Sequence, residues 1–123
     1  HPGTFGTLES MSGYFAAPHD GSLAGASANE LAEHDPSLLT RNGAAGLRQA
    51  HVRVYLAAGR RERVVLAQTQ RYASLLTALS IDHRLASSAG GHVGKTWRVA
   101  LSRALPYALA PPPTAPVRVP AFH

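Results

Sequence analysis

The chain has 123 residues, no cysteine and a formal net charge of +5 at neutral pH. This length fits one domain with its own core, and the absence of cysteine excludes a disulfide framework and thiolate chemistry. No stretch approaches the roughly 20 apolar residues that a membrane span needs. The positive charge comes from 11 arginines against one lysine. A basic balance alone is weak evidence for nucleic acid, so we expect neither a nucleic-acid partner nor a membrane span in this segment.

The first part of the chain predicts a strand and then an irregular excursion. Residues 5–12 mix apolar and polar positions between Pro2-Gly3 and Gly13, which indicates a short strand. Residues 16–46 are rich in Ala, Gly, Ser, Asn and Asp, which predicts a surface excursion placed like a cap over a site. Within it, Ser27 and Glu30 form a capping-box pattern for a short helix over residues 26–34. Asp35-Pro36 then ends that helix.

The second part alternates strands with helices. Residues 52–58 predict a buried strand ending at Gly59, and residues 82–88 predict another. The helix between them has an apolar face of Val65, Thr69, Tyr72, Leu76 and Leu79. A second amphipathic helix follows Gly90-Gly91, with a stripe of Trp97, Ala100, Leu101, Ala104, Leu105 and Ala108. This order predicts an α/β fold with parallel strands and crossover helices. Residues 111–123 predict a proline-rich tail, extended from 111 to 120.

The segment from Ala89 to Thr96 (AGGHVGKT) permits two incompatible interpretations. It matches a relaxed phosphate loop between a strand and a helix, in which backbone amides and Lys95 would hold phosphates and Thr96 would bind magnesium. Against that interpretation, Ala89 replaces the first glycine. Only 27 residues follow, and they contain no apolar strand ending in Asp that would supply the second metal contact.

The alternative is a hydrolase site at the carboxyl ends of the strands. His92 follows the strand over residues 82–88, and Gly90 and Gly91 allow a sharp turn and leave space around the imidazole. Glu62 lies just beyond the strand over residues 52–58, where the acid of a triad belongs when the chain order is nucleophile, acid, histidine. Glu62 would orient His92, and His92 would take the proton from a serine.

Three segments in order resemble the putative-esterase branch of the α/β hydrolases, which includes esterase D-like enzymes and secreted mycolyltransferases. Residues 1–15 (HPGTFGTLESMSGYF) are similar to the family's turn and strand ending in Ser-Gly. Residues 56–62 (LAAGRRE) are similar to its strand ending in Gly, two variable residues and an acid. Gly90-Gly91-His92 with Trp97 is similar to its turn into the last helix. A glutamate at position 62 matches the mycolyltransferases better than the esterase D-like members, in which the acid is commonly Asp.

The resemblance implies that residues 1–110 are the C-terminal part of an α/β-hydrolase domain with an incomplete sheet. No G-x-S-x-G elbow occurs in the chain, and the chain begins at His1 without a signal-peptide pattern. We therefore expect the nucleophilic serine upstream or on another chain, and no hydrolysis by this chain alone. The expected substrate is an ester or acyl donor, with no cofactor, and the family slightly favours a secreted or cell-envelope location. A non-catalytic hydrolase-fold fragment remains the alternative, and the phosphate loop a third.

Other residues have less specific roles. Trp97 is expected to anchor the core, and Tyr14-Phe15 fits either an acyl pocket or packing. The remaining histidines lack the short spacings of zinc sites, so no metal is expected.

Overall fold

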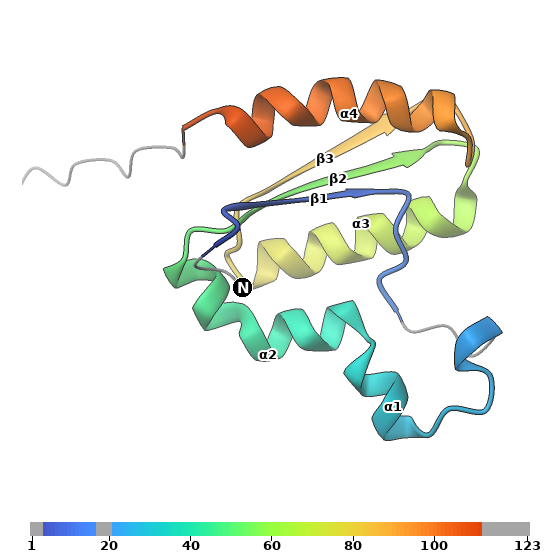
Figure 1. Cartoon of the computed structure of the whole chain (residues 1–123), viewed down its shortest axis with the longest axis vertical. Helices are drawn as coiled ribbons and strands as arrows, with labels where there is room; N and C mark the ends of the chain where they lie inside the picture. Colours follow the sequence, from blue (N-terminus) through green and yellow to red (C-terminus); the bar gives the residue numbers. More distant parts are fainter. Residues whose placement is uncertain (1–3, 17–20, 112–123) are drawn as a thin grey trace, which may run out of the picture.

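The computed structural model describes residues 4–16 and 21–111 (Figure 1). Two predicted segments lie partly outside the described part. These are the proline-rich tail predicted over residues 111–123, from residue 112 onward, and residues 1–3 of the first motif. The elements in chain order are β1 (Thr7–Met11), the 3₁₀ turn η1 (Gly21–Leu23), α1 (Ala28–Glu33), α2 (Pro36–Gln49), β2 (Arg53–Gly59), α3 (Arg63–Ala78), β3 (His83–Ser88) and α4 (Gly94–Leu109).

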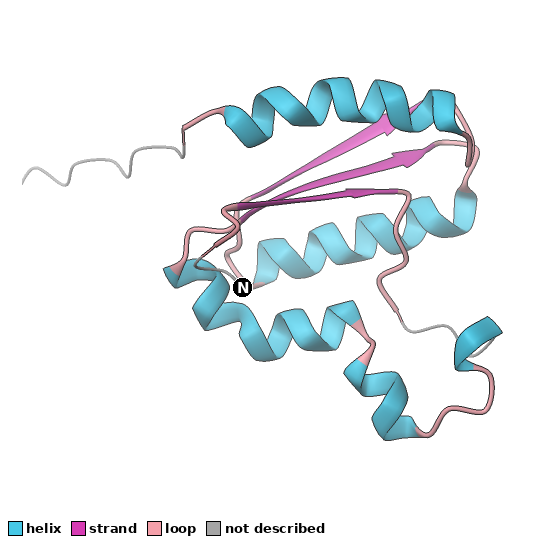
Figure 2. Cartoon of the chain, in the orientation of Figure 1, coloured by secondary structure: helices cyan, strands magenta, loops and turns pink. Residues whose placement is uncertain are grey.

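The three strands form one parallel sheet in the order β1-β2-β3 (Figure 2). Thr7 is paired with Arg53, and Val54 with His83. All seven residues of β2 are buried, as a central parallel strand requires. Within the described residues, β1 and β3 each have one side without a neighbouring strand. The predicted α/β class, parallel strands and incomplete sheet are therefore confirmed.

Helices cover both faces of the sheet (Figure 1). On one face, α2 and α3 enclose the larger core, which contains Val54 and Leu56 of β2 together with Leu76 of α3. On the other face, Tyr55 and Ala57 of β2 pack against α4. Alternate residues of β2 thus supply both cores, and the layers hold all three carboxyl strand ends at one edge.

The interpretation of residues 16–46 as a surface excursion is wrong for its second half. Residues Pro36–Gln49 form the 14-residue helix α2, and Ala44 is part of the larger core. Asp35 is the N-cap of this helix, accepts a hydrogen bond from the Leu38 amide and places Pro36 in the first turn. Asp-Pro therefore ends α1 and also starts α2, because proline suits the first helical position, where its missing N–H has no partner to lose.

The predicted apolar stripe of α4 is partly wrong. Ala100 and Ala104 are buried against the sheet together with Thr96, whereas Leu101 is 39% exposed and Leu105 is 46% exposed. The contact face of α4 follows an i, i+4 row of small residues, because a helix can approach a sheet closely where its side chains are short.

No helix in the described ranges is both long and apolar enough to span a bilayer.

Tyr107 and Arg53 join the end of α4 to the start of β2. The buried Arg53 donates hydrogen bonds to the carbonyl oxygens of Ala108 and Ala110, at 3.2 and 2.7 Å, and its guanidinium lies 5.1 Å from the Tyr107 ring centre. The Tyr107 hydroxyl is buried and has no hydrogen-bond partner among the described residues. Burial and the negative charge of Asp82 raise the pKa of Tyr107, against the opposing effect of Arg53 and Arg84.

We predict that the free energy of unfolding falls as the pH rises above about 10, the ordinary tyrosine value. Below that value Tyr107 is protonated in both states, and above it the unfolded chain loses the proton more readily. Tyr107→Phe removes this contribution, and it costs less than about 1 kcal/mol at neutral pH because the hydroxyl has no partner to lose. Urea unfolding at pH 7 and at pH 10.5 measures both effects. If Tyr107→Phe lost as much unfolding free energy between pH 7 and pH 10.5 as the unaltered chain, Tyr107 would not be the group responsible.

We predict that the isolated chain self-associates. The free side of β1 offers unpaired backbone groups, and Leu8 on that strand is 51% exposed, so a second copy can pair with it. Light scattering coupled to gel filtration checks this expectation. A soluble, cooperatively folded monomer would refute it.

Candidate active site

Three polar side chains meet at the carboxyl edge of the sheet, each from the loop that follows a different strand. Ser12 follows β1, Glu62 follows β2 and His92 follows β3. Parallel strands bring their carboxyl ends to one edge, which is where open α/β sheets place their ligand and catalytic sites. The strand order therefore joins residues that are 50 and 30 positions apart in the chain.

Glu62 is buried at 8% exposure, just before the first residue of α3. Its Oε2 atom accepts a hydrogen bond of 2.7 Å from the Gly59 amide, so the carboxylate turns back over the end of β2. Gly59 itself has no room for a side chain, since an added Cβ would lie 2.3 Å from the Gly90 carbonyl oxygen. Glu62 is therefore a buried carboxylate and not a solvated surface charge.

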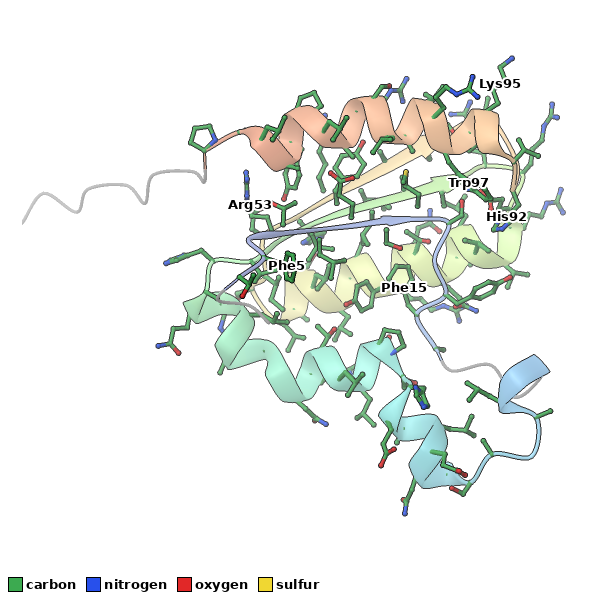
Figure 3. All side chains as sticks on the ribbon, viewed as in Figure 1. Phe5, Phe15, Arg53, His92, Lys95 and Trp97 are labelled. Carbon is green, nitrogen blue, oxygen red and sulfur yellow. The ribbon has the colours of Figure 1, made fainter. Side chains whose placement is uncertain are left out.

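His92 bonds to the other oxygen of the same carboxylate. Its Nδ1 atom lies 2.6 Å from Glu62 Oε1. With Nδ1–H donating to the carboxylate, a neutral imidazole has its lone pair on Nε2. The His92 side chain is 56% exposed, and its ring packs edge-on against Trp97 with 4.9 Å between ring centres (Figure 3). The imidazole is thus held on one side and accessible on the other.

Ser12 is a site residue whose role the sequence pattern does not reveal. Its hydroxyl donates to Glu62 Oε2 at 2.8 Å and accepts from the Trp97 indole Nε1 at 3.1 Å. The residue is buried, and its backbone has φ of 58°, a left-handed conformation that costs a non-glycine residue about 1–2 kcal/mol. The Ser-Gly pair that follows β1 is visible in the sequence, but only the tertiary structure shows that the hydroxyl holds the carboxylate.

The electrostatics of Glu62 follow from these contacts. Burial alone would raise the pKa of the carboxyl, but hydrogen bonds from Ser12, the Gly59 amide and His92 outweigh it and hold the pKa of Glu62 below its ordinary value. Glu62 is therefore ionised at neutral pH. A fixed anion on Nδ1 stabilises the imidazolium that forms when Nε2 takes a proton.

The loop from Ala89 to Thr96 lacks features that a phosphate cradle requires. The buried Thr96 packs against Gly90, where an added Cβ would lie 1.9 Å from its Oγ1 atom. The amide of Val93 bonds to the Gly91 carbonyl, and that of Thr96 to the Val93 carbonyl. The loop is folded on itself rather than open around an anion. Of the two geometries weighed from the sequence, the contact between His92 and Glu62 is the one present.

The neighbouring aromatic residues have separate environments. Trp97 is half-buried and forms part of the site through Ser12 and His92, and it belongs to neither hydrophobic core of the described residues, so the core-anchor role expected for it is wrong. Phe15 is buried and stacks on Tyr72 with 4.1 Å between ring centres, so it packs the core, whereas Tyr14 is exposed. Over residues 4–16 and 21–111, no cluster of three or more His, Cys, Asp or Glu side chains is arranged to hold a metal ion.

Comparisons with known proteins bear on the family and the fold of the chain. A family model described as putative esterase matches residues 1–108. Among solved structures, the chain is similar to the enterobactin esterase Fes from Shigella flexneri, crystallised in the presence of 2,3-dihydroxy-N-benzoyl-serine. The two share 26% sequence identity with a TM-score of 0.59, over 85% of this chain and 24% of the esterase. No curated protein gives a significant match.

We predict that Ser12→Ala raises the pKa of Glu62, because it removes a hydrogen bond to the charged form. The stability that the lowered pKa contributes is present above the unfolded-state value and is lost as the pH falls through the folded value. The variant should therefore gain less stability between acid and neutral pH, and lose about 1.5–3 kcal/mol at pH 7. NMR titration of the Glu62 carboxyl carbon and urea unfolding measure the two effects.

Two variants serve as controls for Ser12→Ala. Ser12→Gly also removes the hydroxyl but relieves the left-handed backbone, so it should raise the pKa equally while losing less stability. Ser74→Ala removes an exposed hydroxyl that bonds only to a helix carbonyl. An unchanged Glu62 pKa in both Ser12 variants would show that the hydroxyl does not support the carboxylate.

Proposed function

Because the chain belongs to the putative esterase family, we propose that it is the C-terminal part of a serine carboxylesterase or acyltransferase, with His92 as general base and Glu62 as the orienting acid. The observation that carries the proposal is the 2.6 Å contact between His92 Nδ1 and a buried, ionised Glu62. A histidine held by a carboxylate on one nitrogen and accessible on the other is suited to removing a proton from a serine.

We propose that the nucleophilic serine comes from a segment upstream, or from another chain. Three observations support this: the chain spans 24% of the similar esterase, it has no G-x-S-x-G elbow, and the free side of β1 can accept a further strand. Among the described residues, Ser12 lies close to the site, but its hydroxyl already donates to Glu62 and does not bond to His92. Ser12 is therefore a positioning residue and not the nucleophile.

The proposed chemistry divides the reaction into two steps. The serine oxygen attacks the ester carbonyl as its proton moves to His92 Nε2, and the tetrahedral intermediate collapses when His92 returns that proton to the departing alcohol. Water, or an acceptor alcohol in a transferase, then attacks the acyl-enzyme with His92 again as base. Throughout, Glu62 remains ionised, holds the ring orientation and stabilises the imidazolium.

For the substrate, we propose an ester of an N-acylated serine as the first class to test. The support is the similarity to an esterase crystallised with 2,3-dihydroxy-N-benzoyl-serine. The compound is an N-acyl amino acid with a free carboxyl group, which is what hydrolysis of its ester would release.

We predict that the polypeptide that contains this chain and its upstream serine is labelled by a fluorophosphonate, whereas this chain alone is not. His92→Ala should lower the labelling rate and the kcat/KM for an N-benzoyl-serine ester on the order of 10⁴-fold or more. Glu62→Gln should lower both by a similar order, because the amide favours the wrong tautomer and leaves the imidazolium unstabilised. Intact mass and ester hydrolysis are the two readouts.

The matched control for these variants is His83→Ala. His83 stands at the start of β3, at the opposite end of the sheet from His92, and its Nδ1 atom contacts the Ile81 carbonyl oxygen. Its replacement should leave kcat/KM within about threefold, since it makes no contact with the site. Full labelling and turnover in folded His92→Ala protein would overturn the proposal.

A further inference from the structure

A cavity of about 660 Å³ lies beside the proposed catalytic residues, but neither His92 nor Glu62 lines it. Its walls are the turn after β2, the end of β3, the loop from Ala89 to Val93 and one side of α4. Four basic side chains line it: Arg60, Arg61, Lys95 and Arg103. Figure 3 shows Lys95 at the same end of the sheet as His92.

Backbone hydrogen bonds fix the two arginines at the cavity. The amide of Arg60 bonds to the Ser88 carbonyl at 2.7 Å, and that of Arg61 bonds to the Gly90 carbonyl at 3.1 Å. These bonds extend the pairing of β2 with β3 by two residues beyond the strands. A Cβ built at Gly91 would lie 3.7 Å from the Arg61 Cβ, so the loop passes close to the arginine stem. The arginines therefore start from a rigid backbone.

The positive charge at this cavity has no counter-ion within the described part of the chain. The ion pair found there is that of His92 with Glu62, and no carboxylate of residues 4–16 or 21–111 pairs with the four basic side chains within 4 Å. On α4, Lys95 and Arg103 are eight residues apart, or about 12 Å along the helix. Cations spread around a concave wall raise the local concentration of anions.

We propose that this cavity binds the carboxylate or phosphate group of an anionic small molecule, a site separate from the proposed esterase chemistry. The arginine forks suit a planar carboxylate or a phosphate, and Lys95 adds a point charge. The binding groups are side chains, unlike the amides of a phosphate loop. The Ser88 hydroxyl in the cavity wall has no hydrogen-bond partner among the described residues. Rotation of this side chain toward the cavity would allow its hydroxyl to donate to a bound anion.

The experiment titrates the 123-residue chain with inorganic phosphate and, separately, with benzoate, against sodium chloride at constant ionic strength. Trp97 is the sole tryptophan and lies two residues from Lys95, so its fluorescence reports binding. The amide NMR signals of Gly90 and Gly91 give a second readout. We expect saturable binding of at least one anion, weakened on the order of threefold or more by Arg61→Gln and by Lys95→Gln.

The matched control is Arg98→Gln, which removes the same charge from α4 at an exposed residue outside the cavity wall. It should leave the affinity within about twofold. Saturation by phosphate alone assigns a phosphorylated ligand, and saturation by benzoate assigns a carboxylate. No saturation by either anion, or equal weakening by Arg98→Gln, would overturn the proposal. Lys95→Gln lies in an exposed first turn, so it provides a test even if Arg61→Gln fails to fold. The measurement needs no nucleophile, so its result is independent of whether His92 is catalytic.

Discussion

The arrangement at the carboxyl edge of the sheet depends on keeping one charged carboxylate, that of Glu62, away from water. Burying an ionised carboxyl costs several kcal/mol unless hydrogen bonds replace its hydration. Three donors do so here, and each belongs to a different strand end: the Ser12 hydroxyl, the Gly59 amide and the His92 imidazole. Glu62 therefore joins the ends of all three strands, and the position of His92 follows from that requirement.

Two backbone features serve the same arrangement. Ser12 has a left-handed conformation in which its hydroxyl reaches Glu62, and the two hydrogen bonds of that hydroxyl together with its burial offset the conformational cost. Gly59 lets the turn after β2 touch the backbone of Gly90, and Gly90 leaves room for the Thr96 side chain at the start of α4. The glycines are needed for close approach of the backbones, and the space around the imidazole is a consequence of the turn that they allow.

At this edge of the sheet, the Glu62 carboxylate does not pair with the basic side chains near it in the sequence. Glu62 lies between Arg61 and Arg63 in sequence, yet its carboxylate bonds to His92 and not to either arginine. Since Glu62 bonds to the imidazole, no carboxylate in the described part of the chain pairs with the cations of the neighbouring cavity. The net charge of +5, which in the sequence indicates no particular partner, thus has a local concentration next to the proposed catalytic residues.

The three strands, the helices other than α2 and the family could be predicted from the sequence, which also named Glu62 and His92 as the candidate site residues. Buried parallel strands are continuous apolar runs, helices have a 3.6-residue period, and motif spacing is a local property of the chain. The helix α2 was missed because Gly43, Gly46 and Asn42 have low helix propensity, and its formation depends on packing Ala44 and Leu47 against the sheet. The exposure of Leu101 and Leu105 was missed because several stripes of α4 are apolar, and only contact with β2 selects one.

The sequence by itself determined which candidate residues follow each strand, because the position of a strand can be predicted from the local pattern of apolar and polar residues. The tertiary structure decided that Glu62 is buried, that Ser12 holds it and that four cations line one cavity without a carboxylate partner among the described residues. Those facts arise from contacts between loops 30 and 50 residues apart, and no local pattern encodes the distance between two loops before the sheet brings their strand ends together.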